Sequence, residues 1–478
     1  MINSKDIKSF LELEKDLSLF ERKYDGFYYW QFLRFHLCES LFGNRINLVK
    51  EENKKRKSFY RFVIETITAL IISLKEFLFL CFCKSVDMLL LKENSIKDKF
   101  FDSWKIPEEI SSYSFRTVPY ENTYEKNDHF LEWPRIRTKL HYELHNRLGL
   151  FKAINDKKEK KFLVKLEKKL VEIYGQCISA DEMEKMIQEM YVENKFYSKY
   201  FRWLFRMTKC KAVVVVVYYK SYLFSAYKVA KNNGIRVIEL QHGVINNHEE
   251  YWFEDRRGIN NYTPDYLLTY GDIHNSWIKL VNEKKPISIG YPYQEKCINK
   301  LKNLETDEKL IVIYPESDSV FENILDRFIN IIVLFGYKVV MKIHPLQTKN
   351  VSLYYPVLSK NKNVKIITKD NSEGIYYWLK RAKHHIMAST TVGLEAVAFD
   401  HTNICICLNI PHDQTQCLLD WGIARGFSSE DELVDLIKNP IIYNSEFIDE
   451  IRTQLWKNDA INNVTDFFRV IKANKWDY

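Results

Sequence analysis

The stretch CKAVVVVVYY, residues 210–219, decides the fold of this chain. Its run of β-branched residues shows no alternation of apolar and polar side chains, which is typical of a strand buried on both faces of a parallel sheet. The helical pattern SYLFSAYKVAKNNG and the strand pattern IRVIELQ follow it directly. Strand, helix and strand in this rhythm predict a parallel sheet with right-handed crossovers.

A second set of alternating strands and helices begins at Lys309. It opens with KLIVIYPES and continues through YKVVMKIHP, NVKIITK, HHIMAS and NICICL, with helical patterns between them. Residues 298–309, between the two sets, are mostly polar and are predicted to be a linker. The sequence therefore predicts an α/β protein with two doubly wound, Rossmann-like domains that face a cleft.

The predicted organisation has four parts. Residues 1–84 form a helical N-terminal region, 85–298 the first Rossmann-like domain, 309–443 the second, and 444–478 a C-terminal helix. Within the first domain, long helices are expected at 141–174 and 180–207, and residues 96–140 are expected to be irregular. A chain of 478 residues is too long for one compact core, which agrees with this division.

Composition limits the class of protein. Hydrophobic residues make up 46% of the chain, so a globular interior can be filled and disorder is excluded. The nine cysteines form no CxxC pair and no zinc-type spacing, and the charged first twenty residues do not resemble a signal peptide. We therefore expect a cytoplasmic protein with free thiols and no metal. The net charge of +8 is modest for this length, and no nucleic-acid partner is expected.

A basic cluster and an apolar segment lie together at residues 54–83. KKRK at 54–57 precedes a segment whose longest uncharged run is the nine residues 66–74, too short to cross a bilayer. One interpretation is an amphipathic helix on the anionic inner face of a membrane. The other is a helix buried against the protein's own core.

Polar residues follow nearly every predicted strand, at the edge where parallel α/β sheets bind ligands. In KIHP, Lys342 and His344 alternate on an extended strand and share one face, and Pro345 stops the strand. A Lys and a His that point into a cleft suit a phosphate-bearing ligand, although HP alone is a common dipeptide.

In MASTTVGLEAVAF, the hydroxyls of Ser389, Thr390 and Thr391 lie where a strand becomes a helix, which predicts either an anion site or an ordinary helix cap.

The KIHP and STT motifs together resemble the nucleotide-binding domain of GT-B glycosyltransferases. The closest pattern is that of bacterial surface-polysaccharide transferases with an HP motif followed by an S-S/T motif: sialyl-, polysialyl- and Kdo transferases, and teichoic-acid polyol-phosphate polymerases. The resemblance covers residues 210–408. It implies that His344 meets the donor phosphate or acts as a general acid, and that Ser389 and Thr390 bind the phosphate. From their places at or just after the strand ends, the expected nucleotide-donor site also includes Lys342, Thr391, Glu395 and Glu316. Glu395, one turn along its helix, is either a partner for a ribose hydroxyl or only a capping or surface acid.

Departures from related patterns refine the expected reaction. Common retaining GT-B enzymes carry a second Glu before this helix, but Met387 stands at that position, which favours inversion. No convincing DxD motif is present, so the expected reaction needs neither metal nor cofactor.

An inverting transferase needs a base from the first domain, and we rank His242 first, then Glu249 and Glu250, then Asp272. His242 has a second interpretation, as a buried residue that holds its loop. On this acceptor side the expected residues are Gln241, Asp272 and Tyr291.

The sequence therefore predicts a peripheral membrane enzyme of bacterial capsule, lipopolysaccharide or O-antigen synthesis. It would move a sugar from a CMP-sugar, or next a UDP-sugar, to a lipid-linked or growing glycan. Three alternatives stay open: a CDP-polyol polyol-phosphate transferase, a UDP-sugar 2-epimerase, and a scaffold that binds no nucleotide.

Overall fold

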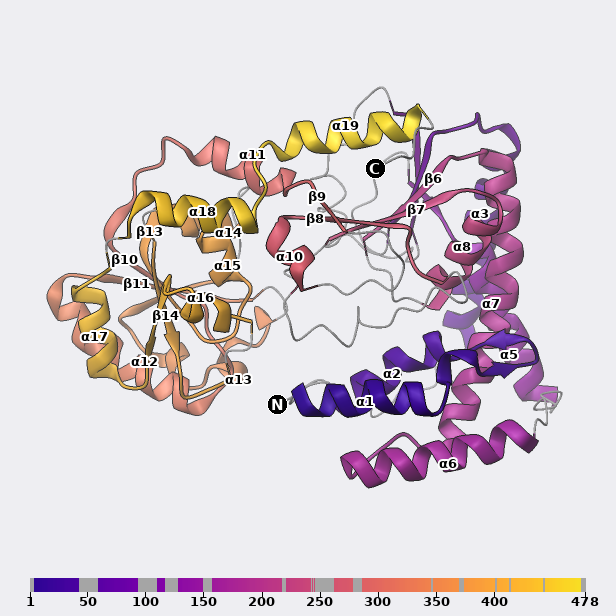
Figure 1. Cartoon of the computed structure of the whole chain (residues 1–478), viewed down its shortest axis with the longest axis horizontal. Coiled ribbons are helices and arrows are strands. Elements are labelled where there is room, and N and C mark those ends of the chain that lie inside the picture. Colours follow the sequence, from indigo (N-terminus) through magenta and orange to yellow (C-terminus); the bar gives the residue numbers. More distant parts are fainter. Residues whose placement is uncertain are drawn as a thin grey trace.

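The computed structural model describes residues 4–42, 59–92, 110–116, 128–148, 157–216, 221–241, 243, 245, 262–277, 286–344, 347–368, 374–399, 402–411, 414–441 and 443–473. Figure 1 shows two α/β domains side by side, the N-terminal domain on the right and the C-terminal domain on the left.

The N-terminal domain is built on a seven-stranded sheet in the order β5-β4-β3-β6-β7-β8-β9, and every neighbouring pair is parallel. Its strands are β3 (Met88–Lys92), β4 (Ser112–Arg116), β5 (Asp128–Phe130), β6 (Ala212–Val215), β7 (Arg236–Leu240), β8 (Tyr266–Thr269) and β9 (Ile287–Ser288). The chain starts in the middle of the sheet, builds one edge, and returns to build the other. The order reverses between β3 and β6.

The C-terminal domain repeats this plan with six parallel strands in the order β12-β11-β10-β13-β14-β15. They are β10 (Asp307–Ile313), β11 (Lys338–Lys342), β12 (Val364–Ile367), β13 (Ala382–Met387), β14 (Asn403–Cys407) and β15 (Ala424–Phe427). Both sheets have the strand order of a Rossmann domain. The predicted α/β fold class, with two Rossmann-like domains and added N-terminal helices, is confirmed.

The β-branched run that predicted the sheet is buried on both faces. Val213 and Val215 of β6 belong to the core beneath the N-terminal helices. Ala212 and Val214 belong to the core on the opposite face, which continues into the C-terminal domain. Because successive side chains of a strand point to opposite faces, only apolar residues suit both positions.

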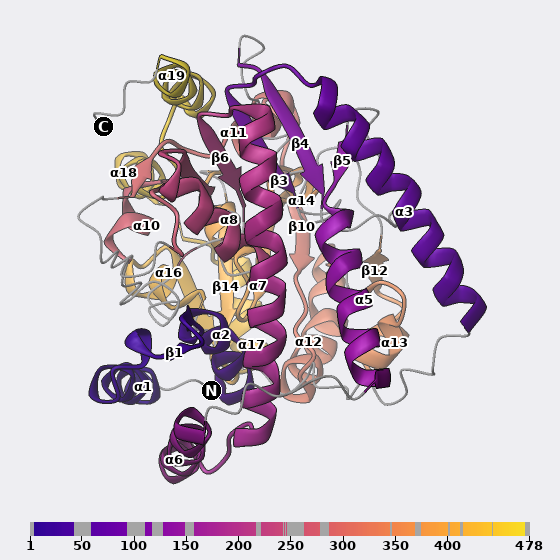
Figure 2. The same ribbon diagram turned by 90° about the vertical axis from the view of Figure 1, so that its right-hand side faces the viewer.

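Helices cover both sheets. Those of the N-terminal domain are α1 (Ser4–Asp16), α2 (Trp30–Phe42), α3 (Phe59–Phe82), α5 (Glu132–Leu148), α6 (Lys157–Tyr174), α7 (Ala180–Thr208), α8 (Ser221–Asn232), α10 (Asp272–Ser276) and α11 (Pro292–Leu301). Figure 2 shows the long helix α7 beside the sheet, with α5 and α3 toward the outer side. A capping box starts α7, because Ser179 and Glu182 each accept a hydrogen bond from the other's backbone N–H.

The helices of the C-terminal domain are shorter. They are α12 (Ser319–Ile332), α13 (Val351–Tyr354), α14 (Ile375–Arg381), α15 (Val392–Ala396), α16 (Gln416–Asp420) and α17 (Glu430–Lys438). Single 3₁₀ turns lie at η1 (Leu19–Glu21), η5 (Val333–Phe335) and η7 (Leu358–Lys360).

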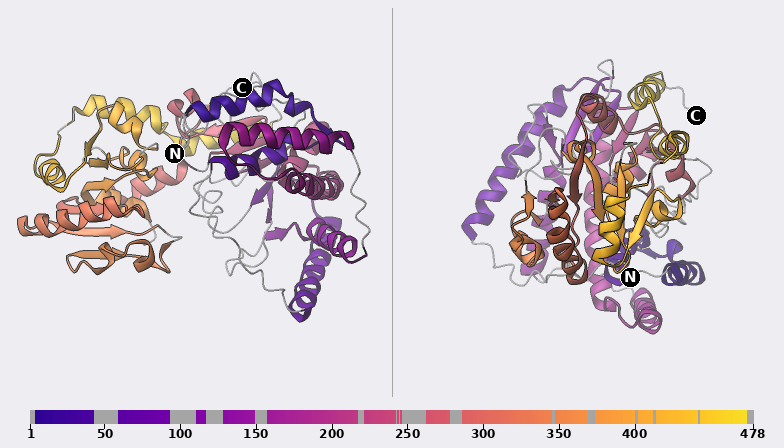
Figure 3. Two further views of the ribbon diagram at one scale, coloured as in Figure 1. Left: turned by 90° about the horizontal axis from the view of Figure 1, so that it is seen from below. Right: turned by 90° about the vertical axis from the view of Figure 1, so that its left-hand side faces the viewer.

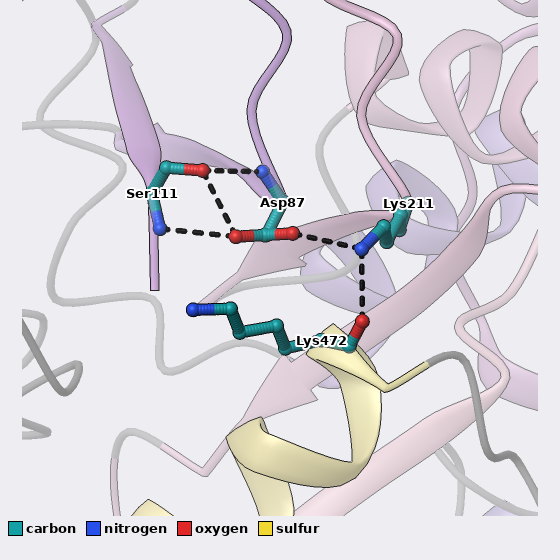
Figure 4. Close-up of polar contacts among 4 residues, drawn as sticks. All are labelled: Asp87, Ser111, Lys211 and Lys472. Carbon is teal, nitrogen blue, oxygen red and sulfur yellow. Dashed lines mark hydrogen bonds and ion pairs between the residues drawn. The ribbon is translucent and has the colours of Figure 1, made fainter. Parts of the chain in front are cut away.

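After the second domain the chain returns to the first. Helix α18 (Ser445–Leu455) packs on the C-terminal domain, and α19 (Ala460–Lys472) crosses to the N-terminal domain (Figures 1 and 3). At the end of α19, Lys211 Nζ donates to the carbonyl oxygen of Lys472 at 2.8 Å and to Asp87 Oδ1 at 2.9 Å, as Figure 4 shows. This segment links the two domains a second time.

Several predicted elements were wrong. The expected helix at 141–174 is two helices, α5 and α6, and α5 begins at Glu132. Residues 96–140, expected to be irregular, contain β4 and β5. The expected linker 298–309 overlaps α11 and β10, which leaves residues 302–306 between them, and the expected C-terminal helix is the pair α18 and α19. The N-terminal region also contains a small hairpin, β1 (Lys23–Tyr24) and β2 (Phe27–Tyr28).

Candidate functional site

A pocket of about 580 Å³ opens where the strand order of the C-terminal sheet reverses. Strands β10 and β13 are neighbours there, and the chain leaves their carboxyl ends in opposite directions along the sheet. Ligands of doubly wound folds bind at this point. The described residues that line the pocket are Tyr314, Pro315, Glu316, Lys342, Ile343, His344, Gln347, Ile375, Ser389, Thr390, Thr391, Val392, Glu395 and Gln414. Every donor-site residue predicted from the sequence is among them.

Lys342 and His344 lie on one wall, at the end of β11. The Lys342 side chain is buried, and its Nζ donates to the carbonyl oxygen of Ile343 at 3.0 Å. His344 is exposed. Partial desolvation and then the charge of Lys342 lower the pKa of His344, which favours the neutral imidazole. A bound phosphate would raise the pKa of His344, and its negative charge would attract both side chains.

The hydroxyl residues form the opposite wall, in the connection from β13 to α15. Thr390 Oγ1 accepts from the backbone N–H of Val392 at 3.4 Å, and Ser389 Oγ accepts from that of Gln414 at 3.5 Å. Both hydroxyl oxygens accept in these contacts, so neither contact uses the O–H donor of Ser389 or Thr390. The expected contribution of a helix dipole is small, because α15 has only five residues.

Two carboxyl groups enter the same pocket from different strand ends. Burial raises the pKa of Glu316 to about 7, although the backbone amide of Ser389 partly offsets this effect. Burial also raises the pKa of Glu395 to about 7, against the nearby Tyr376 hydroxyl. Near neutral pH each group is therefore partly protonated and can donate as well as accept a hydrogen bond.

Glu395 also lies close to the junction between the domains. Its charge adds to burial in raising the pKa of Tyr270 and Tyr291, which come from the N-terminal domain. These two rings stack at 4.3 Å, and Trp456 packs against Tyr270 at 5.4 Å. The donor pocket therefore lies against the N-terminal domain.

Of the three residues expected on the acceptor side that the structure describes, only Asp272 is exposed. Gln241 is buried: its Nε2 donates to the carbonyl oxygen of Gly243 at 2.7 Å, and its Oε1 accepts from the N–H of Tyr270 at 2.8 Å. The Gln241 amide thus holds two strand ends together.

Asp272 accepts a hydrogen bond from Ser288, while Tyr291 is packed in the domain junction. His242, Glu249 and Glu250 lie outside the described residues.

The structure adds residues that the sequence did not indicate. Gln347 and Gln414 line the pocket, and Gln347, three residues after His344, accepts from the Tyr355 hydroxyl at 2.6 Å. His274 of α10 is fully buried, its Nδ1 lies 3.2 Å from the carbonyl oxygen of Ile245, and burial lowers its pKa to about 4. Gln347 could have been found from its place beside the KIHP motif. His274 follows the strand-end motif YGD and carries no further signal in sequence.

Potential metal ligands do not cluster in the part of the chain that is described: no group of three or more His, Cys, Asp or Glu residues is placed to hold an ion. Independence of metal stays a prediction.

Comparison with known proteins gives no family. No family model and no curated protein matches the chain. Among solved structures, UDP-GlcNAc 2-epimerase from Methanocaldococcus jannaschii is 13% identical, with 82% of this chain and 100% of that chain covered and a TM-score of 0.46. The wall teichoic acid polymerase TagF is 11% identical, with 87% and 97% covered and a TM-score of 0.43. These likenesses carry no argument about the chemistry, which rests on the pocket.

Proposed function

We propose that this chain is an inverting, metal-independent glycosyltransferase that takes its sugar from a nucleotide-sugar donor. The observation that carries the proposal is the convergence of Lys342, His344 and the hydroxyls of residues 389–391 on one pocket at the reversal point of the C-terminal sheet. Cationic, imidazole and hydroxyl donors on facing walls match the oxygens of a phosphate group.

We assign the following roles to these residues. Lys342 supplies a fixed positive charge, and His344 supplies an N–H donor to the leaving phosphate. Ser389 and Thr390 donate to the remaining phosphate oxygens. Glu395 accepts from a ribose hydroxyl, and Glu316 borders the same space. A CMP-sugar is our first donor and a UDP-sugar our second.

The acceptor would enter from the N-terminal domain and lose a proton as its hydroxyl attacks the anomeric carbon. We keep His242 as the first candidate base, then Glu249, Glu250 and Asp272. The proposed acceptor is a lipid-linked or growing surface glycan.

Attachment to the inner face of a bacterial membrane is part of this proposal. Helix α3 exposes large apolar side chains at helical spacing: Ile64, Ile67, Leu70, Ile71, Leu74, Phe77, Leu78 and Phe82. Such a row supports a helix that lies on a bilayer surface. Among the described helices, none is long and apolar enough to cross a membrane. Flotation with anionic vesicles tests the attachment, and failure to float would remove it.

Product analysis tests the reaction class. Purified enzyme is incubated with CMP-, UDP- or CDP-activated donors, each with and without a glycan acceptor. A transferase releases nucleotide only when acceptor is present, and its product has the anomeric configuration opposite to that of the donor. Conversion of UDP-N-acetylhexosamine without acceptor would instead identify an epimerase. Release of CMP from a CDP-polyol would identify a polyol-phosphate transferase.

A further inference from the structure

A second pocket, of about 480 Å³, lies outside the donor site, between α3, α5 and α7. Figure 2 shows these three helices on the outer side of the N-terminal domain. The described lining residues are Leu70, Ser73, Leu74, Glu76, Phe77, Trp133, Tyr200 and Trp203. The pocket is thus almost entirely apolar and aromatic, and it contains one carboxyl group. Its volume is in the range of small-molecule sites.

Glu76 is the unusual member of this lining. Its side chain is 3% exposed, and neither carboxyl oxygen has a hydrogen-bond partner among the described residues. The neighbouring buried carboxylate, Glu132, does have a cation, because Arg135 Nη1 lies 3.3 Å from its Oε1. A buried carboxyl group without a partner is costly, so it marks a site that a ligand can complete.

Aromatic rings surround this carboxyl group. Phe77 and Trp203 stack at 5.8 Å, and Tyr200 meets Trp203 edge-on at 6.0 Å. Trp133 stands on the α5 side, and the guanidinium of Arg137 lies 5.6 Å from its ring, so this ring already attracts a cation on the surface. Aromatic faces carry partial negative charge and bind alkylammonium ions, with Trp the strongest.

We propose that this pocket binds a small organic ammonium ion, with Glu76 as its counter-ion and Phe77, Trp133, Tyr200 and Trp203 as its aromatic walls. The apolar walls suit the alkyl groups of such an ion, and the carboxylate suits its charge. A pure hydrocarbon would leave Glu76 buried without a partner, and an anion would be repelled. The site is independent of the proposed transferase reaction.

The neighbourhood of Glu76 makes binding depend on protons. Burial and then the charge of Glu132 raise the pKa of Glu76 well above its usual value. The backbone N–H of Glu132, which does not reach hydrogen-bonding geometry with either carboxyl oxygen, offsets only part of this rise. The charged and titratable groups around it are Glu132, Arg135 and Lys139 on α5 and Glu193, Tyr197 and Tyr200 on α7. The ammonium ion pairs with the ionised carboxylate, so its arrival releases the Glu76 proton to solvent.

Calorimetry of the full chain with choline and with 3,3-dimethylbutan-1-ol, its uncharged isostere, tests the proposal. We expect choline to bind at least about tenfold more tightly, because only choline supplies a charge for Glu76 and the rings. Its affinity should rise with pH by up to about tenfold per unit while Glu76 is protonated. Equal affinity for the two compounds, or no binding of choline at any pH, would overturn the proposal.

Two variants locate the site. Glu76→Gln keeps the shape and removes the charge, and we expect it to weaken choline binding by at least about tenfold. Cys81→Ser, exposed on the same helix but outside the pocket, is the matched control and should bind choline as the wild type does. Quenching of tryptophan fluorescence by choline should be lost only in Glu76→Gln. Unchanged binding in Glu76→Gln would contradict the assignment, and if this variant does not fold, the comparison of the two ligands still decides.

Discussion

Two carboxyl groups in the donor pocket hold protons at a pH where most glutamates have lost them. Glu316 and Glu395 come from different strand ends, and burial raises the pKa of each to about 7. A group of this kind in a cleft is a marker of function, because an ordinary surface carboxylate would have no reason to be desolvated. The two groups therefore give the pocket a pH dependence that can be measured.

Glu395→Gln should change how stability depends on pH. The folded-state pKa of Glu395 is above its usual value, so its contribution is fully present below about pH 4.5 and is lost as pH rises through about 7. Wild-type stability should therefore fall relative to the variant between pH 5 and 7, by up to about 1.4 kcal/mol per pH unit. Urea unfolding across this range measures it. Glu450→Gln, at an exposed position on α18, is the control. Parallel curves for wild type and Glu395→Gln would contradict the assignment.

His344→Ala should lower turnover without loss of stability. His344 is exposed at a strand end, so little packing is lost, but the leaving phosphate loses an N–H donor. Removal of one such donor typically lowers kcat by about 10²- to 10³-fold. Initial rates with the preferred donor measure the effect. Lys349→Ala, an exposed cationic residue in the same connection, should behave as the wild type. A fully active His344→Ala enzyme would remove the leaving-group role.

Sequence reasoning reached the donor pocket because each of its motifs ends a recognisable strand. Lys342, His344 and residues 389–391 line one space because parallel strands bring their carboxyl ends together. The high pKa of Glu395 could not be read from sequence. It comes from burial in the folded chain, at a place where the charge of Glu395 also acts on Tyr270 and Tyr291, more than a hundred residues away along the chain.

At the scale of elements, the strands were more predictable than the helices. Runs such as AVVV and NICIC are buried on both faces, and an uninterrupted short run of this kind predicts a buried strand. The expected helix at 141–174 was wrong because the sequences of α5 and α6 both favour helix, and no Pro in this range separates the two patterns. Strand β5 was missed because it has three residues, too few for a periodic pattern.

Gly271, before α10, should be intolerant of a side chain. A Cβ atom there would overlap the backbone carbonyl oxygens of Gln454 and Leu455 at the end of α18. Because backbone atoms cannot move aside cheaply, we expect Gly271→Ala to destabilise the fold by about 1–3 kcal/mol. Chemical denaturation measures this effect. Gly243→Ala, where the added Cβ would meet nothing within 4 Å, is the control. Equal stability of the two variants would contradict the packing of α10 on α18.

At the scale of the whole molecule, the chain joins its two domains twice. Residues 302–306 connect α11 to β10, and α19 returns to the N-terminal domain. Glu295 of α11 accepts from the first N–H of α19 at 2.6 Å, and Lys211 holds the last turn. The alternation of strands and helices predicted the two domains. The return of α19 depends on long-range contacts and was not predictable from its own sequence.

Asp87→Asn should weaken this second connection. Burial alone would raise the pKa of Asp87, but hydrogen bonds from Lys211 and Ser111 lower it overall (Figure 4). A lowered folded-state pKa gives stability that is present above the usual value of 3.8 and lost as pH falls through the folded value. We expect a loss of about 1 kcal/mol at pH 7 and a smaller loss near pH 3, measured by urea unfolding. Lys472 takes part in this contact through its backbone carbonyl, so Lys472→Ala should keep the hydrogen bond from Lys211 and the pH dependence of the wild type. A loss that is independent of pH would contradict the ionic role.

The central claim is that the pocket of the C-terminal domain binds the nucleotide of a sugar donor. Isothermal titration of the wild type and of Lys342→Met with CMP, UDP, CDP and GDP tests it most directly. We predict that the wild type binds CMP or UDP, with CMP first, and that Lys342→Met binds it at least about tenfold more weakly because a charged phosphate partner is lost. Absence of binding to all four nucleotides, or equal binding by the variant, would contradict the account.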